Sequence, residues 1–94
     1  MQSGDWKGMI QASIDGDASL VRYYLDQGMD PNFFHPEMMT NALLEATRHG
    51  HIEVVEELLK RGALPRLKSQ LGESAIQIAK NIKHKELLKK LKKA

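Results

Sequence analysis

The stretch of sequence that determines the fold is residues 50–62, which read GHIEVVEELLKRG. Its two terminal glycines suit tight turns, because glycine accepts a positive φ without steric cost. Between them Val55, Leu58 and Leu59 recur on one face at helical spacing, with acidic residues and a lysine on the opposite face. The pattern predicts an amphipathic helix over residues 52–61 that begins after one turn and ends at the next.

The same pattern occurs twice more along the chain. Residues 16–28, GDASLVRYYLDQG, align with residues 50–62 at an offset of 34, and both glycines coincide. Residues 83–91, KHKELLKKL, repeat the apolar pattern at an offset of 33. With 94 residues the chain has room for one domain, spanning residues 1–94. Its three units cover about residues 4–32, 33–66 and 67–94.

Each unit is predicted to contain two helices. In the middle unit residues 41–48, NALLEATR, form a short first helix with Asn41 as its N-cap. In the third unit Ser74 and Gln77 have the spacing of a capping box, in which each side chain bonds to the backbone amide of the other residue. No helix can bury its apolar face alone, so the units must stack. We therefore expect an all-α solenoid of three helix-turn-helix units.

These units resemble the ankyrin repeat, which is about 33 residues long. Residues 50–63 are almost the central motif of the family, and residues 28–32, GMDPN, resemble its turn toward the next loop. The Thr-Pro-Leu-His start of the family is replaced by KGMI, NALL and SAIQ in the three units, so the resemblance rests on the glycine and aliphatic positions. It implies an all-α ankyrin-repeat solenoid whose units are linked by finger loops, and a non-catalytic role in protein–protein interaction.

The resemblance also implies where a partner protein binds: at the finger tips and on the exposed, concave face of the short first helices. The corresponding residues are Trp6, Asp15, Phe33, Phe34, Glu37, Met38, Met39, Thr40, Arg48, His49, Leu71 and Glu73. The first finger, residues 33–40, is one residue longer than the next and more apolar. Adjacent methionines in a loop cannot easily both turn inward, which favours contact with a partner. For the three aromatic residues the alternative is a place in the core, with Trp6 capping the open first unit.

Few residues suggest catalysis. The chain has no Cys, and its glycines are scattered and form no phosphate-binding loop. His51 and His84 occupy equivalent turn positions, which favours a structural role over metal binding. Glu53, Glu56 and Glu57 are interpreted as a solvated helix face. We expect no enzymatic activity, no cofactor and no metal ion.

The charge is unevenly distributed. Residues 1–64 contain five basic and ten acidic side chains, whereas residues 65–94 contain nine basic and two acidic ones. Seven lysines between Lys80 and Lys93 suggest an alternative function, a charged adaptor that contacts nucleic acid or another anionic surface through the last helix. The same helix has Leu87, Leu88 and Leu91 on one face, as a polar capping helix needs, and the region lacks aromatic residues for base stacking.

The sequence therefore favours another protein as the partner, with no specific recognition of nucleic acid. No apolar run approaches the length of a membrane span, about 20 residues. The absence of cysteine fits a reducing compartment, and the first residues lack the features of a signal peptide. We expect a cytoplasmic monomer.

Overall fold

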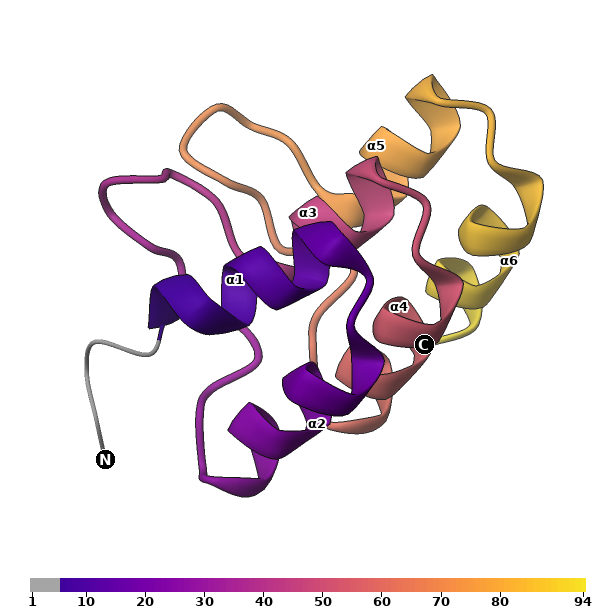
Figure 1. Ribbon diagram of the computed structural model, residues 1–94. Coiled ribbons are helices and arrows are strands. Elements are labelled where there is room, and N and C mark those ends of the chain that lie inside the picture. The colour runs from indigo at the N-terminus through magenta and orange to yellow at the C-terminus, as the bar shows by residue number, and fades with distance from the viewer. Residues whose placement is uncertain (1–5) are drawn as a thin grey trace.

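The computed structural model describes residues 6–94, which form six α-helices and no named strand (Figure 1). The helices are α1 (Trp6–Asp15), α2 (Ala18–Asp26), α3 (Ala42–Arg48), α4 (Ile52–Lys60), α5 (Ala75–Asn81) and α6 (Lys85–Lys93). They form three pairs, each joined by a tight turn, which confirms the predicted all-α repeat fold. The first residues of the predicted first unit, 4 and 5, lie outside the described part.

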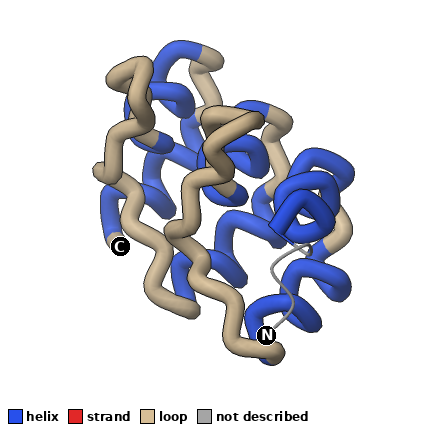
Figure 2. Tube along the Cα trace, turned by 90° about the vertical axis from the view of Figure 1, so that its left-hand side faces the viewer, coloured by secondary structure: helices blue, strands red, loops and turns tan. Residues whose placement is uncertain are grey.

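The six helices form two layers. The first helices of the pairs, α1, α3 and α5, pack side by side, and α2, α4 and α6 form the second layer. Two long loops connect the pairs and run along one side of the helices, where their tips project as fingers (Figure 2). Asn32 ties the loops together, because its amide donates to the carbonyl oxygen of Gly62 at 3.0 Å and its Oδ1 accepts from the Leu64 N–H at 2.8 Å.

The hydrophobic core lies between the two layers. Leu43 and Leu44 of α3 and Val55 and Leu58 of α4 are buried at its centre. The buried face of α4 differs from the one its periodicity predicts, because Val54 is fully buried whereas Leu59 is only partly buried. The reason is that α4 packs against α2, α3 and α6, so neighbouring helices cover more than one side of it.

Glu57 does not lie on a solvated face, as the sequence predicts, but is 5% exposed. Its carboxylate faces α2, where its Oε1 lies 3.2 Å from Arg22 Nε, and its Oε2 lies 3.1 Å from Arg61 Nε. Arg61 in turn contacts Asp26 of α2 at 2.6 Å. A buried carboxylate is tolerated when charged donors satisfy its oxygens. These four residues, the α2–α4 ion-pair cluster, close the seam between the two helices.

His51 locks the middle unit onto the first. Its Nε2 lies 2.8 Å from the carbonyl oxygen of Ile14, which can only accept, so Nε2 is the donor. A Cβ atom on Gly16 would lie 2.6 Å from the His51 ring, so the turn needs glycine for space as well as for its φ of 80°. His84 caps α6 by accepting from the Leu87 N–H at 3.3 Å. These contacts support the structural role predicted for the two histidines.

The predicted caps of the first helices are largely present. Asn41 Oδ1 accepts from the Leu44 N–H at 2.9 Å, and Ser74 Oγ accepts from the Gln77 N–H at 3.2 Å. The second half of the capping box is not formed, because the Gln77 side chain donates instead to Asn81, one turn further along α5. The boundaries of α3 and α5 therefore depend on single side-chain caps.

Replacing Leu58 with Ala is expected to lower the free energy of unfolding by about 2–5 kcal/mol, because it leaves a cavity between stacked helices. Leu64 is 54% exposed, so Leu64→Ala is the matched control and should change that free energy by less than about 0.5 kcal/mol. Urea denaturation followed by circular dichroism measures both. Equal losses would mean that the packing of α4 is misassigned.

The contact between His51 and the first turn can be isolated with two glycines. Gly28→Ala places a side chain at a φ of 95° with no atom within 4 Å, and should cost about 1–2 kcal/mol. Gly16→Ala should cost about 1 kcal/mol more, because the new methyl group displaces His51 from the Ile14 carbonyl. In a His51→Ala background the two substitutions should become equal. An unchanged difference in that background would contradict the proposed clash.

Candidate binding surface

The first finger is held in shape by His35. Its N–H donates to the Thr40 carbonyl oxygen at 2.8 Å, and its carbonyl oxygen accepts from the Met39 N–H at 2.7 Å. Its ring Nδ1 accepts from the backbone N–H groups of Glu37 and Met38, both at 3.2 Å. The backbone of the tip is thus satisfied internally, and Met38 and Met39 remain 37% and 43% exposed. This role of His35 is not predictable from the sequence, because only the folded loop brings these amides to its ring.

The second finger, residues 67–73, has the same design with Ser69 in the place of His35. The Ser69 N–H donates to the Glu73 carbonyl oxygen at 2.7 Å, and Ser69 Oγ accepts from the N–H groups of Leu71 and Glu73 at 3.2 and 3.3 Å. Leu71 at the tip is 72% exposed, more than any other large apolar side chain in the described part of the chain. This loop is one residue shorter, and its positive φ falls on Gly72 where the first finger has Met39.

The aromatic residues predicted for the surface pack largely against the protein itself. The ring of Trp6 stacks on that of Phe33, with centroids 4.1 Å apart and planes at 27°. Phe33 also meets the His35 ring edge-on at 6.4 Å. Trp6 and Phe34 are partly buried against the core. These rings therefore hold the first finger against α1, in agreement with the core alternative.

A cluster of polar side chains connects α3 to both fingers. Its centre is Glu45, which the sequence analysis missed although it stands three and four residues before Arg48 and His49. Glu45 Oε2 accepts from the Thr40 hydroxyl at 2.7 Å and lies 3.4 Å from Arg48 Nε, while Oε1 lies 3.7 Å from His49 Nε2. Arg48 also bonds to Glu73 of the second finger at 3.2 Å, and this hydrogen bond raises the guanidinium pKa above its usual value.

Thr40 and Asp15, both predicted to contact a partner, do not lie at the finger tips. Thr40 is buried, because its hydroxyl points to Glu45, so it supports the finger from within. Asp15 is exposed and accepts from Gln11 at 3.0 Å, but it ends α1, whereas Trp6, beside the first finger, begins that helix. A helix of 10 residues spans about 15 Å, so Asp15 is remote from the finger tips.

Of the remaining predicted residues, Glu37, Met38, Met39 and Leu71 lie on the fingers, whereas His49 follows the end of α3 and stacks on the His51 ring, with centroids 6.2 Å apart. Glu37 is exposed and forms an ion pair with Lys7 at 3.3 Å. A hollow of about 100 Å³ lies between the fingers, lined by Phe34, His35, Pro36 and Met39 of the first and Gln70 of the second. The hollow joins the two loops into one surface, with Met38 and Leu71 exposed at the tips. We call Met38, Met39 and Leu71 the finger-tip patch.

Three stacked helix pairs with projecting loops define a helical repeat protein. A family model described as ankyrin repeats (3 copies) matches residues 9–94, so the chain belongs to the ankyrin repeat family. Members of this family are generally protein-interaction modules, and their fold is generally non-catalytic.

Curated relatives contain similar sequences. The chain is 32% identical over 74 residues to Palmitoyltransferase AKR1 of Lachancea kluyveri, which covers 79% of this chain and 10% of that protein. It is 28% identical over 85 residues to Ankyrin repeat and SAM domain-containing protein 6 of Danio rerio, and the aligned part covers 90% of this chain and 12% of that protein. It is 34% identical over 67 residues to Palmitoyltransferase Hip14 of Drosophila melanogaster, and the aligned part covers 71% of this chain and 10% of that protein.

The chain thus spans about a tenth of the length of these relatives. Two of them are named as transferases, but the similarity is confined to a small part of each protein and does not extend their activity to this chain. Within residues 6–94, no three His, Asp or Glu side chains are grouped so that they could hold a metal ion. None of the helices in the same range is long and apolar enough to cross a membrane.

Proposed function

We propose that this chain is a non-catalytic module that binds a partner protein through its finger loops and the adjoining concave face of α1, α3 and α5. The observation that carries the proposal is the finger-tip patch, in which three large apolar side chains are exposed on two neighbouring loops with internally bonded backbones. Exposed apolar groups of this kind typically mark interaction sites. The flexible methionine side chains can adapt to the shape of a partner.

The rigidity of the fingers supports this proposal. His35 and Ser69 hold the two tips, and the cluster around Glu45 fixes both fingers to α3. Binding to surfaces that are already ordered loses little conformational entropy, so more of the contact energy is available for affinity. A partner would thus meet the two fingers in a fixed relative position.

Charged side chains surround the finger-tip patch. Glu37, paired with Lys7, lies beside the methionines, and Arg48, paired with Glu73, lies at the base of the second finger. An apolar centre with a polar rim is the usual composition of a protein interface. In our proposal the finger-tip patch supplies apolar contact, while Glu37, Arg48, His49 and Glu73 select the partner. The module acts as a monomer, and the absence of cysteine fits a reducing compartment such as the cytoplasm.

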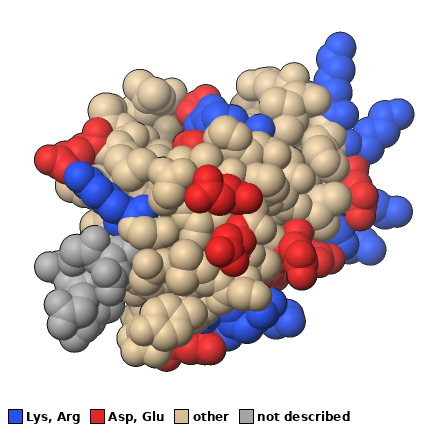
Figure 3. Space-filling view, in the orientation of Figure 1, with Lys and Arg blue, Asp and Glu red and all other residues tan. Residues whose placement is uncertain are grey.

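The charged-adaptor alternative has its own supporting observation. Lysine side chains project from the end of the stack formed by α5 and α6 (Figure 3). Of the seven lysines between Lys80 and Lys93, Lys90 alone forms an ion pair within the described residues. We rank this alternative second, because Leu87 and Leu91 are buried and α6 therefore serves as a polar cap on the core.

The finger-tip patch can be tested by changing Met38 and Met39 together to Ser. A partner is first captured from host lysate with the wild-type chain, identified by mass spectrometry and purified. Calorimetric titration should then show binding at least about tenfold weaker for the double variant, with the melting temperature nearly unchanged. Ile82→Ser is the matched control, because Ile82 is also exposed but lies after α5, away from the fingers. A large fall in melting temperature with intact binding would reverse the assignment.

The alternative predicts a different response to salt. Changing Lys89, Lys90, Lys92 and Lys93 to Gln should not affect binding of the captured partner if these lysines only keep the cap soluble. A nucleic-acid surface that uses all four should give a slope of roughly −3 to −4 when log affinity for a duplex is plotted against log salt concentration. We expect only weak attraction that salt abolishes. Submicromolar duplex binding at physiological salt, lost in the Gln variant, would favour the adaptor.

A further inference from the structure

The second-layer helices meet at two seams, which the sequence repeat makes comparable. At the seam between α2 and α4, two ion pairs connect the helices: Arg22 with Glu57 and Asp26 with Arg61. Both belong to the α2–α4 ion-pair cluster. They place two charged pairs along this seam, one of them with a buried carboxylate.

The seam between α4 and α6 has only one such pair. The repeat offset of 34 places Glu56 at the position of Arg22, and the offset of 33 places Lys90 at the position of Glu57. Glu56 and Lys90 form an ion pair at 2.6 Å, with the charges reversed relative to the first seam. The same offsets place Lys60 and Ala94 at the positions of Asp26 and Arg61. The alanine side chain has no charge, so the second pair between side chains cannot form. Within residues 6–94 Lys60 takes part in no ion pair.

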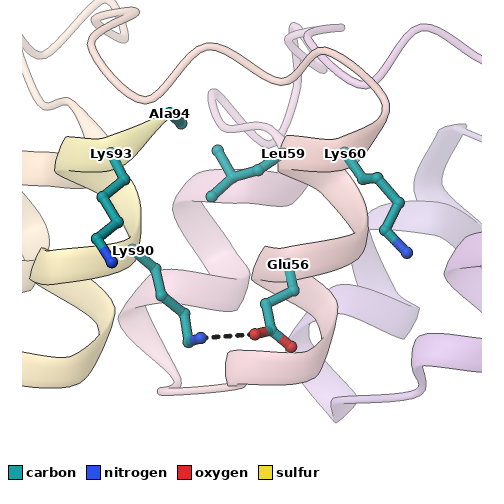
Figure 4. Close-up of a pocket in the computed structure, with 6 residues that line it drawn as sticks. All are labelled: Glu56, Leu59, Lys60, Lys90, Lys93 and Ala94. Carbon is teal, nitrogen blue, oxygen red and sulfur yellow. Dashed lines mark ion pairs between the residues drawn. The ribbon is translucent and has the colours of Figure 1, made fainter.

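A hollow of about 540 Å³ lies at this seam (Figure 4). Leu59 of α4 lies in its middle, with Lys60 to one side and Lys93 of α6 to the other, and the pair of Lys90 and Glu56 crosses below. A second hollow shares Leu59 and Ala94 with it and extends along the loop past Leu64 and Arg66. We call the two together the α4–α6 trough.

The α4–α6 trough combines an apolar lining with an excess of positive charge. Leu59 is partly buried and Leu64 is 54% exposed, so both offer apolar surface. Glu56 is its one acidic residue and is already paired with Lys90, whose pKa this hydrogen bond raises above the usual value. Lys60, Arg66 and Lys93 form no ion pair with any residue in the described range. The trough therefore has three cationic side chains, each without an ion-pair partner in the described range, around aliphatic side chains.

We propose that the α4–α6 trough binds an acidic peptide segment of a partner protein, with a leucine-sized side chain against Leu59 and carboxylates beside Lys60 and Lys93. A carboxylate of the partner would pair with Lys60 as Arg61 pairs with Asp26 at the other seam, with the charges reversed. This surface lies on the second helix layer and is separate from the finger-tip patch.

The shape of the trough favours a peptide over other anionic partners. Its lining includes no aromatic side chain on which a base could stack, and its apolar groups have no counterpart on a phosphate backbone. Membrane-surface helices bury a broad apolar face rich in Trp, Phe and Leu, whereas Leu59 has Lys60 on one side and Lys93 on the other. An aliphatic side chain flanked by carboxylates matches both features.

The proposal can be tested with the full chain and the synthetic fluorescein-labelled peptide EELEELLEE, whose leucines share one helical face. Fluorescence anisotropy at physiological salt should show saturable binding. Replacing every Glu of the peptide with Gln, or every Leu with Ser, should weaken binding about tenfold or more. No binding at millimolar protein, or equal binding of the Gln peptide, would overturn the proposal.

Two adjacent lysines provide the matched control in the protein. Lys93→Glu and Lys92→Glu make the same charge change in the last turn of α6, but only Lys93 lines the trough. Lys93→Glu and Lys60→Glu should weaken peptide binding about tenfold, and Lys92→Glu no more than about twofold. Equal losses would mean general attraction to a basic region, and the proposal would fail.

A rebuilt seam gives an independent check. The double variant Lys60→Asp with Ala94→Arg copies the Asp26 and Arg61 pair, so it should fill the trough and abolish peptide binding while the chain stays folded. Unchanged affinity in this variant would overturn the proposal, as would tighter binding of duplex DNA or phosphatidylserine vesicles that depends on Lys60 and Lys93. The Met38→Ser and Met39→Ser double variant should bind the peptide normally, which separates this test from that of the fingers.

Discussion

Everything in this molecule depends on one constraint: no helix pair can bury its apolar face without a neighbouring pair. Val55 and Leu58 of α4 are buried only because α2, α3 and α6 surround that helix. The units must therefore come close, and His51 reaches the backbone of the preceding turn only because Gly16 leaves the space. This close stacking fixes the spacing of the loops between pairs, so the rigidity of both fingers is a consequence of how the core is buried.

The sequence was sufficient for the features that depend on local pattern. The period of residues 50–62 predicts α4, and the positions of Asn41 and Ser74 predict the starts of α3 and α5. It was not sufficient where the partner of a side chain lies far along the chain. Glu57 has the spacing of a surface residue, and nothing near it reveals that Arg22, 35 residues earlier, will face it across a seam. Gln77 shows that even a local motif can lose to a competing local contact.

In the candidate binding surface, too, some features follow from local sequence and others depend on contacts with distant residues. The exposure of Met38, Met39 and Leu71 agrees with the sequence argument, because loop tips have little to pack against. The places of Thr40 and the aromatic residues could not be derived in that way. Thr40 is drawn inward by a carboxylate on α3, the helix that follows it, and Phe33 stacks on the Trp6 ring at the start of α1. A residue type indicates what a side chain can contact, and the folded loop determines which contact it makes.

The two joints between units are unequal, and this has a thermodynamic consequence. Between the outer helices, the first joint has two ion pairs, whereas the second has an open trough and the single pair of Lys90 and Glu56. The His51 hydrogen bond also crosses the first joint, and the pair of Arg48 and Glu73 crosses the second. In a linear array each joint contributes its own term to stability, so the third unit should be the first to open. The two fingers belong to successive units, because the first leads into α3 and the second into α5. A partner that grips both would therefore act as a clamp, and its affinity would be coupled to the closing of the weaker joint.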